Sequence, residues 1–408
     1  MRHLSLSPVL LSLATALLGA AACTADPAIV SGPSSRAAAA TAVPAAERAT
    51  AAARWNALTR TIMGRREFGP LGAARSYALV SVAQYNAVIA AGEAKERGVH
   101  PSEAGAAAAA AAAVLAGLYP TEQAVIAAQL AADAAYFPAL PSERDADFDA
   151  GVAVGQAVAA AVLAHAATDG SDAVWTGTIP TGPGRWVNAP PPAQPVSPLW
   201  GRVRPWHMTA GDQFRPTAPP AFGSPEFLAA LAEVRRYTDA RTPEQLRIAQ
   251  FWQGGSGPAG PMGHFGARAV ELAARQHLGE RQATRLLAVM YTAIMDASIG
   301  CWDAKFAYWY VRPFQADPLI TTPVGRPNFP AYPSAHSCLS AAAVGVLAAF
   351  FPAAAGELQA QVEEAGLARL YAGLHFQFDI DAGRQLGYDV AALALAQAPV
   401  GHGAISLR

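Results

Sequence analysis

The chain has 408 residues, of which 52% are hydrophobic and 14% charged, and its formal net charge is -1. This composition supports a folded protein with a sizeable core and excludes a largely disordered one. The 29 basic and 30 acidic side chains lack the basic excess that nucleic-acid binders use against phosphates. We therefore expect no nucleic-acid partner, and any cationic site must be local.

Residues 1–23 have the pattern of an export signal: Arg2, then an apolar run, then Ala20-Ala21-Ala22-Cys23. Two processing routes remain open, because the alanines suit an ordinary signal peptidase, whereas the stretch ending at Cys23 resembles a bacterial lipobox. We expect an exported protein, periplasmic or extracellular. Its only expected membrane contact is a lipid on Cys23.

Residues 24–53 are rich in Ala, Pro, Ser and Thr without apolar periodicity, which predicts a flexible linker. Residues 54–169 predict an N-terminal helical bundle, because their apolar stretches are alanine-rich and separated by Pro and Gly. Period-2 runs of β-branched and aromatic residues are scarce, so the fold class is predicted to be all-α. The expected helices cover residues 73–95, 101–118, 121–136 and 142–167.

Residues 170–223 are rich in Pro and Gly and contain four tryptophans, which predicts an ordered loop that covers something. Residues 224–400 predict a C-terminal helical bundle, with a strong helix start at Thr242-Pro243-Glu244-Gln245. The architecture is therefore two packed bundles, with the active site in the second and the tryptophan-rich loop over or near it. Gly254-Gly255-Ser256-Gly257 lacks the Gly-Lys-Ser/Thr ending of a phosphate loop, so no nucleotide cofactor is expected.

Lys305 and Arg312 are seven residues apart, or about two helical turns. If the helix continues to Pro313, both cations project from one face and suggest an anion site. The alternative is a solvated basic face. The aromatic surroundings, including Trp302, argue against that alternative.

A second segment, Phe329-Pro330-Ala331-Tyr332-Pro333-Ser334-Ala335-His336, leads into an apolar helical run. Ser334 is suited to cap that helix, whose free backbone N–H groups and positive dipole end attract oxyanions. His336 at the helix start can give or accept a proton near neutral pH, although a capping or surface histidine is the plainer interpretation.

A third segment places His375 six residues after Arg369 and Asp379 four residues after His375. The guanidinium of Arg369 can grip two oxygens, and His375 can offer a nitrogen lone pair to phosphorus or vanadium. Asp379 can hold the other imidazole nitrogen. An ordinary Arg–Asp pair with a half-buried histidine is the alternative.

In order and spacing, the three segments resemble the signature of the type-2 phosphatidic acid phosphatase and vanadium-dependent haloperoxidase superfamily. Its elements are Lys-x6-Arg-Pro, Pro-Ser-x-His and Arg-x5-His-x3-Asp, matched here from Lys305 to Asp379. Trp302 and the residues from Phe329 to Ser334 make the chain similar to the soluble vanadium chloroperoxidases, which include bacterial members.

The resemblance implies a vanadate cofactor, or phosphate in a phosphatase. Lys305, Arg312 and Arg369 would neutralise the oxyanion, while Ser334 and the N–H of Ala335 would hydrogen-bond it. His375 would be the vanadium ligand, His336 the acid-base group, and Lys305 and Asp379 further catalytic residues. Trp302 and Phe329 would form a halide pocket.

The implied activity is oxidation of a halide by hydrogen peroxide, with an organic acceptor as a further small-molecule substrate. The first alternative is an exported acid phosphatase of soluble phosphomonoesters, in which His375 becomes phosphorylated and His336 protonates the leaving alcohol. Ala368, where the phosphatase form usually has Ser, favours the peroxidase. The second alternative is a non-catalytic oxyanion-binding lipoprotein.

Cys301 and Cys338 are the cysteines that remain after the export signal. In an oxidising compartment they could form a disulfide. Two small buried thiols are the alternative.

Overall fold

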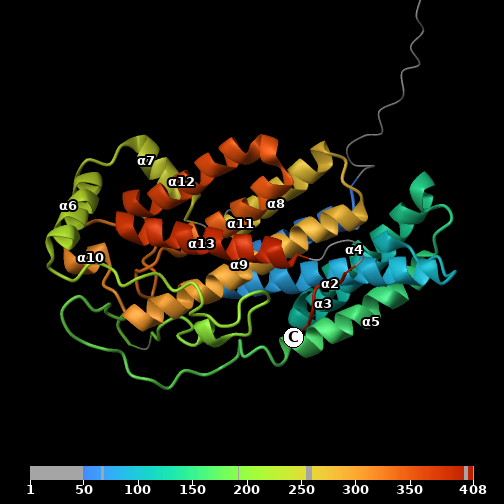
Figure 1. Cartoon of the computed structure of the whole chain (residues 1–408), viewed down its shortest axis with the longest axis horizontal. Coiled ribbons are helices and arrows are strands. Elements are labelled where there is room, and N and C mark those ends of the chain that lie inside the picture. Colours follow the sequence, from blue (N-terminus) through green and yellow to red (C-terminus); the bar gives the residue numbers. More distant parts are fainter. Residues whose placement is uncertain (1–48, 66–68, 192, 254–259, 399–402, 408) are drawn as a thin grey trace, which may run out of the picture. The chain divides into compact units, whose positions relative to one another are not determined.

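The computed structural model describes residues 49–65, 69–191, 193–253, 260–398 and 403–407, all of which belong to one compact unit (Figure 1). The predicted export signal, Cys23, most of the linker and Gly254–Gly257 lie outside these residues. The first helix begins at Ala51, with Ala51 and Ala52 fully buried. Residues 51–53, assigned to the linker, are therefore part of the folded body.

The N-terminal bundle is built from alanine-rich helices that pack closely. Ser102 and Asp147 cap two of them by accepting hydrogen bonds from the N–H groups of Gly105 and Ala150. A side chain at Gly155 would lie 2.3 Å from the carbonyl oxygen of Ala106, so glycine permits this close approach. The helices are α1 (Ala51–Arg65), α2 (Pro70–Glu96), α3 (Glu103–Leu118), α4 (Gln123–Tyr136) and α5 (Phe148–Ala166).

Within the described residues, α5 is the one helix whose length and composition would suit a membrane span. One face of α5 packs against α3.

The chain also contains short 3₁₀ helices: η2 (Pro120–Glu122), η3 (Phe137–Ala139), η4 (Pro141–Glu143), η5 (Trp200–Arg202) and η6 (Pro352–Ala354).

The C-terminal bundle surrounds α9 (Glu280–Tyr308), a 29-residue helix. The predicted start at Thr242 is confirmed, because Thr242 and Gln245 form a reciprocal capping box. The remaining helices are α6 (Pro225–Asp239), α7 (Pro243–Phe251), α8 (Pro261–Arg275), α10 (Pro313–Ala316), α11 (Ala335–Phe350), α12 (Ala355–Tyr371) and α13 (Gln377–Gln397). The described residues contain two isolated β-bridges and no β-strand, which confirms the all-α class.

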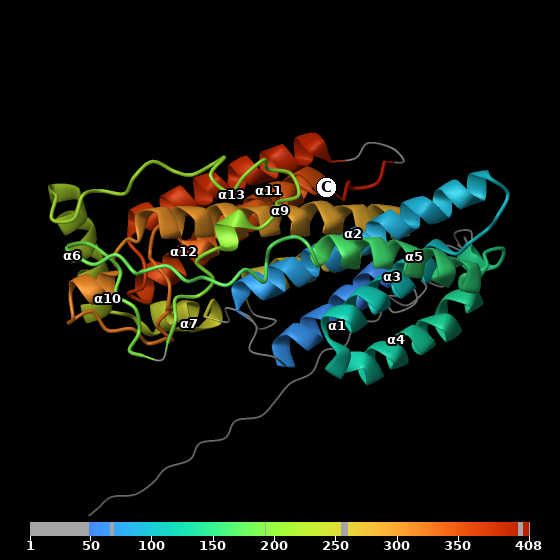
Figure 2. The same cartoon turned by 90° about the horizontal axis from the view of Figure 1, so that it is seen from below.

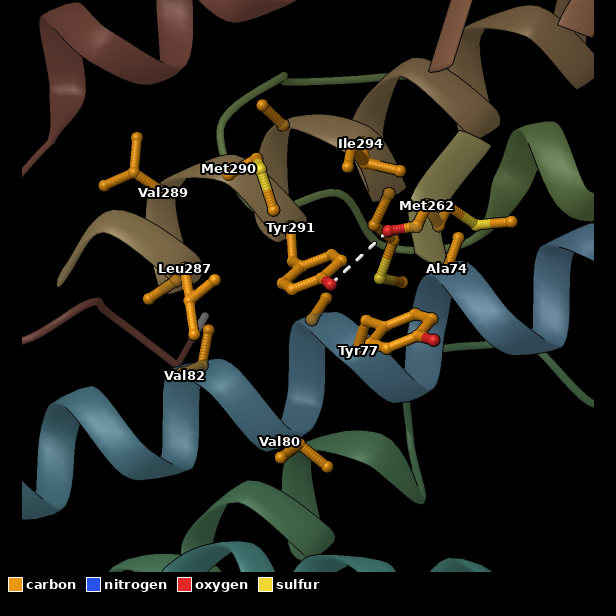
Figure 3. Close-up of a cluster of buried hydrophobic side chains, with 14 of the residues drawn as sticks. Ala74, Tyr77, Val80, Val82, Met262, Leu287, Val289, Met290, Tyr291 and Ile294 are labelled. Carbon is orange, nitrogen blue, oxygen red and sulfur yellow. Dashed lines mark hydrogen bonds between the residues drawn. The ribbon is translucent and has the colours of Figure 1, made fainter. Parts of the chain in front are cut away.

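Helix α9 joins the two bundles, because it packs against α2 on one side and α11 and α13 on the other (Figures 1 and 2). The rings of Tyr77 on α2 and Tyr291 on α9 stack with centroids 4.6 Å apart. The hydroxyl of Tyr291 accepts from the side chain of Asn56 on α1. It also donates to the carbonyl oxygen of Met262 on α8 (Figure 3). Both bundles therefore share one hydrophobic core.

The tryptophan-rich segment, residues 170–223, is irregular apart from η5 and is fastened to α9. The buried carboxylate of Asp296 accepts from the N–H groups of Trp206, His207 and Met208 at 2.7–3.0 Å. Asp303 pairs with Arg215. The segment also reaches the end of α9, where the indole N–H of Trp302 donates to the carbonyl oxygen of Val196.

Candidate oxyanion site

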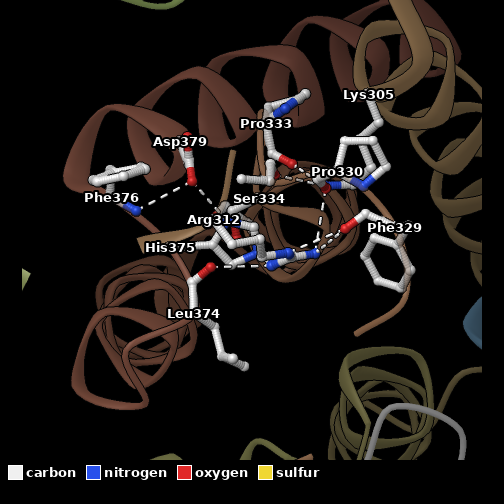
Figure 4. A network of polar contacts seen from close by, with 12 residues as sticks. Lys305, Arg312, Phe329, Pro330, Pro333, Ser334, Leu374, His375, Phe376 and Asp379 are labelled. Carbon is white, nitrogen blue, oxygen red and sulfur yellow. Dashed lines mark hydrogen bonds and ion pairs between the residues drawn. The ribbon is translucent and has the colours of Figure 1, made fainter. Parts of the chain in front are cut away.

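The predicted site residues come together at helix ends, where charged side chains meet backbone groups without intrahelical partners. Figure 4 shows five of them: Lys305, Arg312, Ser334, His375 and Asp379. The last turns of α9 and α12 carry Lys305 and Arg369, and the starts of α11 and α13 carry Ser334, His336 and Asp379. Arg312 caps α10, and His375 lies between α12 and α13.

The prediction that Lys305 and Arg312 project from one helix is wrong. Helix α9 ends at Tyr308 because Trp309 takes a left-handed conformation, with φ of 50°. Arg312 follows in an extended conformation, just before Pro313. The two cations still come together, because the chain turns back on itself.

Lys305 is fully buried, and its ammonium group is surrounded by backbone oxygens rather than carboxylates. Nζ donates to the carbonyl oxygens of Pro330 and Ala331 at 3.0 and 2.7 Å, and also to that of Pro333. These bonds fix the chain that leads into Ser334. Burial lowers the pKa of Lys305 to about 8, because the charged form loses its hydration.

Arg312 is also fully buried, and its guanidinium joins two segments of the site. Nε and Nη2 donate to the carbonyl oxygen of Phe329 at 3.1 and 2.9 Å. Nη1 donates to the carbonyl oxygen of Leu374 and lies 3.0 Å from Nε2 of His375. Burial lowers the pKa of Arg312 to about 9.

His375 is 3% exposed and held in one orientation by its two ring nitrogens. Nδ1 lies 2.8 Å from Oδ2 of Asp379, so Nδ1 carries the proton and donates it to the carboxylate. Nε2 is then unprotonated, and its lone pair accepts a hydrogen bond from Nη1 of Arg312. Burial, followed by the charge of Arg312, holds the pKa of His375 well below its ordinary value. The ring is thus a neutral donor of a lone pair.

Asp379 anchors the start of α13 as well as the imidazole. Its Oδ2 also accepts from the N–H of Phe376 at 3.1 Å, and its backbone oxygen accepts from the N–H of Ser334 at 2.8 Å. Oδ1 is buried without a hydrogen-bond partner among the described residues. Burial raises the pKa of Asp379 to about 7, against the opposing bond from Phe376.

Helix α11 begins at the site, with Ser334 as its N-cap and Ala335 as its first residue. The hydroxyl oxygen of Ser334 accepts from the N–H of Ser337, as expected of a cap. The N–H groups of Ala335 and His336, also in the first turn, are available to an anion in the way that helix starts generally are.

His336 and Arg369 face one another across the start of α11. Nε2 of His336 donates to the carbonyl oxygen of Trp252 at 2.7 Å and lies 3.4 Å from Nη1 of Arg369. Nη2 of Arg369 donates to the carbonyl oxygen of Ala249, and its Nε has no hydrogen-bond partner among the described residues. Burial, followed by the Arg369 charge, holds the pKa of His336 well below its ordinary value. Burial lowers the pKa of Arg369 to about 10.

The charge balance favours an anion. None of Lys305, Arg312 and Arg369 forms an ion pair with a carboxylate of the described residues, and Asp379 is the acidic side chain in the cluster. The same part of the chain holds no group of three His, Cys, Asp or Glu side chains suited to a metal cation. A tetrahedral oxyanion would restore the interactions that burial takes from the cations.

Vanadate fits this donor set. It needs negative-charge compensation, which three buried cations supply, and a nitrogen ligand, which Nε2 of His375 supplies. The unpaired Nε of Arg369 and the N–H groups at the start of α11 are further donors. Phosphate fits the same set.

A cavity of about 140 Å³ opens beside His336 and Arg369. Its other walls are mostly apolar: Pro70, Gln253, Pro261, Met262, Gly325, Pro327, Phe329, Ala335, Leu339 and Leu374. Of the two residues expected to form a halide pocket, one lines this cavity. Phe329 lines the cavity, whereas Trp302 lies behind the Phe329 ring, with centroids 4.9 Å apart, and does not.

Cys301 and Cys338 are both free and buried, so the disulfide alternative is not what the structure contains. The thiol of Cys301 instead donates to the carbonyl oxygen of Pro333, which also accepts from Lys305. Burial raises the pKa of Cys338 well above its ordinary value, as expected of a thiol in the core.

Sequence reasoning missed the backbone groups that hold the cations. The carbonyl oxygens of Phe329, Leu374 and Ala249 have no side-chain signature. It also missed Gly373, which has φ of 71° and directs the chain from Arg369 to His375. A Cβ at Gly373 would lie 2.8 Å from Ile320 and 3.0 Å from the oxygen of Thr321. A glycine just after a helix was the available signal.

Comparison with known proteins finds relatives of similar fold. A family model described as the PAP2 superfamily matches residues 283–400. A bacterial vanadium-dependent iodoperoxidase structure is similar, with a TM-score of 0.70 and 21% identity, covering 84% of this chain and 95% of its own. A holo-type bacterial vanadium-dependent chloroperoxidase gives 0.64 and 14% identity, covering 80% and 92%. The search of curated proteins gave no match.

Proposed function

We propose that the chain is a vanadium-dependent haloperoxidase-like enzyme, and the PAP2 superfamily match over residues 283–400 supports this. It oxidises a halide with hydrogen peroxide. The proposal rests on Nε2 of His375, whose lone pair Asp379 orients toward three buried cations. Within the described residues, none of these cations has a carboxylate partner. The named activities of the similar bacterial structures support the choice.

His375 would hold vanadate through Nε2, with Asp379 keeping the proton on Nδ1. Lys305, Arg312 and Arg369 would balance its charge, and the N–H groups at the start of α11 would hydrogen-bond its oxygens. When bound, vanadate supplies a Lewis acid that activates peroxide toward the halide.

His336 moves the proton in this proposal. Its Nε2–H leaves Nδ1 as an acceptor, and its lowered pKa keeps the ring neutral in the absence of an anion. The cavity admits peroxide and halide beside it, with Phe329 in the wall. Ala335 at the wall and the fully buried Ala368 offer no hydroxyl to the anion.

The test is halide oxidation by the purified protein, measured with peroxide and added vanadate and again with added phosphate. We expect oxidation with vanadate only, lost in His375→Ala. His264→Ala is the matched control, because His264 binds Gln361 outside the cation cluster. Phosphatase activity without vanadate, together with no halide oxidation in its presence, would establish the phosphatase alternative instead.

We also propose export to the periplasm or the outside of the cell, with Cys23 as a lipidation site. Cell fractionation of the full chain and of Cys23→Ser tests both. Retention in the cytoplasm contradicts export, and a water-soluble wild-type protein contradicts lipidation.

A further inference from the structure

Met262 lies in the first turn of α8 and lines the cavity that also contains His336 and Arg369. Its side chain is 2% exposed, so the oxidants of bulk solvent reach it poorly. An oxidant formed inside the cavity has this side chain in its wall. Most of the remaining wall is aliphatic or proline and does not compete for such an oxidant.

The other methionines of the described residues are buried and line none of this cavity: Met63, Met208, Met290 and Met295. Two of their sulfurs are engaged elsewhere. The hydroxyl of Tyr119 contacts the sulfur of Met63, and the indole N–H of Trp206 donates to that of Met295. Met262 is therefore the methionine in the cavity wall, and the other four serve as internal references for its oxidation.

We propose that Met262 is a modification site at which the enzyme's own hypohalous product forms methionine sulfoxide. This inference rests on the proposed function, because that activity supplies the oxidant. The oxygen of the hypohalous acid bonds to sulfur, the oxygen–halogen bond breaks, and halide and a proton leave. Sulfur loses the two electrons that the halogen gains. The sulfoxide places a polar oxygen in the apolar wall, so activity declines with turnover.

The direct readout is mass spectrometry of peptides after turnover with bromide, peroxide and vanadate. We expect Met262 to gain one oxygen about tenfold more than any of the four reference methionines. Peroxide without bromide should not produce this difference. Excess free methionine removes oxidant that has escaped, so Met262 oxidation should persist in its presence.

Two variants separate this effect from general damage. Met262→Leu keeps an apolar wall without a thioether and should abolish the decline of rate with turnover, whereas Met290→Leu should decline as the wild type does. Bromide oxidation without preferential Met262 oxidation overturns this inference and leaves the proposed function standing. Absence of bromide oxidation overturns both.

Discussion

His375 and Asp379 lie four residues apart and share a hydrogen bond of 2.8 Å that decides which imidazole nitrogen faces Arg312. Asp379→Asn should weaken that orientation and reduce vanadate affinity about 10- to 100-fold, as loss of a carboxylate behind a ligating histidine does. Equilibrium dialysis measures the affinity. Asp381→Asn, on the exposed side of the same helix, should retain it. Equal affinities of Asp379→Asn and wild type would contradict the orienting role.

Lys305 gives a pH dependence. Below pH about 8 its ammonium group is charged in the folded protein, so its contribution to anion affinity is complete. Above that pH the folded protein loses this charge, and affinity for sulfate, whose own charge stays constant, should fall. Calorimetric titration across this range measures the change.

The variant Lys305→Arg should move this loss of affinity to higher pH, because arginine keeps its proton. Lys95→Arg, an exposed substitution on α2, should leave it in place. For the ligand-free protein, the pKa of Lys305 is lower folded than unfolded. The unfolded chain therefore binds more protons between pH about 8 and 10.5, and the contribution of Lys305 to stability rises with pH there. A sulfate affinity that does not change across this pH range would contradict the assignment of the dependence to Lys305.

Gly373→Ala should lower the free energy of unfolding by about 1–3 kcal/mol, because its φ is positive and the new methyl group meets Ile320 and Thr321. It should also weaken anion binding, since Gly373 sets the path to His375. Urea unfolding and sulfate titration measure the two effects. Gly356→Ala has open space and should be neutral or stabilising by up to about 1 kcal/mol. If both variants behave alike, the steric argument is wrong.

Asp296→Ala should release the tryptophan-rich segment from α9, because three buried N–H groups lose their acceptor. We expect a loss of about 2–4 kcal/mol in stability and faster proteolysis within residues 170–223. Asp239→Ala removes an exposed pair with Arg235 and should cost less than about 1 kcal/mol. Unchanged proteolysis in Asp296→Ala would show that other contacts hold the segment.

The sequence was most informative where chemistry requires particular side chains at fixed spacing. The three motif segments do converge, and the all-helical class follows from the alanine-rich stretches. Prediction failed where backbone conformation and backbone carbonyl groups determine the geometry of the site. The left-handed Trp309 takes Arg312 off α9, and carbonyl oxygens, which any residue could supply, hold the cations.

The sequence also could not show which side chains line the cavity or which neighbours they contact. Trp302 and Phe329 look equivalent as aromatic neighbours of Lys305, yet Phe329 alone of the two lines the cavity. Asp296 lies on the same helix as Lys305, yet it binds the backbone of the tryptophan-rich segment. Such distinctions depend on which side of a helix faces which neighbour, and that is settled by tertiary packing.

Helix α9 carries Tyr291 in the shared core, Asp296 under the tryptophan-rich segment and Lys305 in the cation cluster. Its central amides should therefore exchange with deuterium only through global unfolding, whereas loop amides exchange through local opening. The cation cluster is thus built onto the slowest-exchanging part of the protein. Fluctuations that admit small molecules must come from the surrounding loops and not from the helix that holds the lysine.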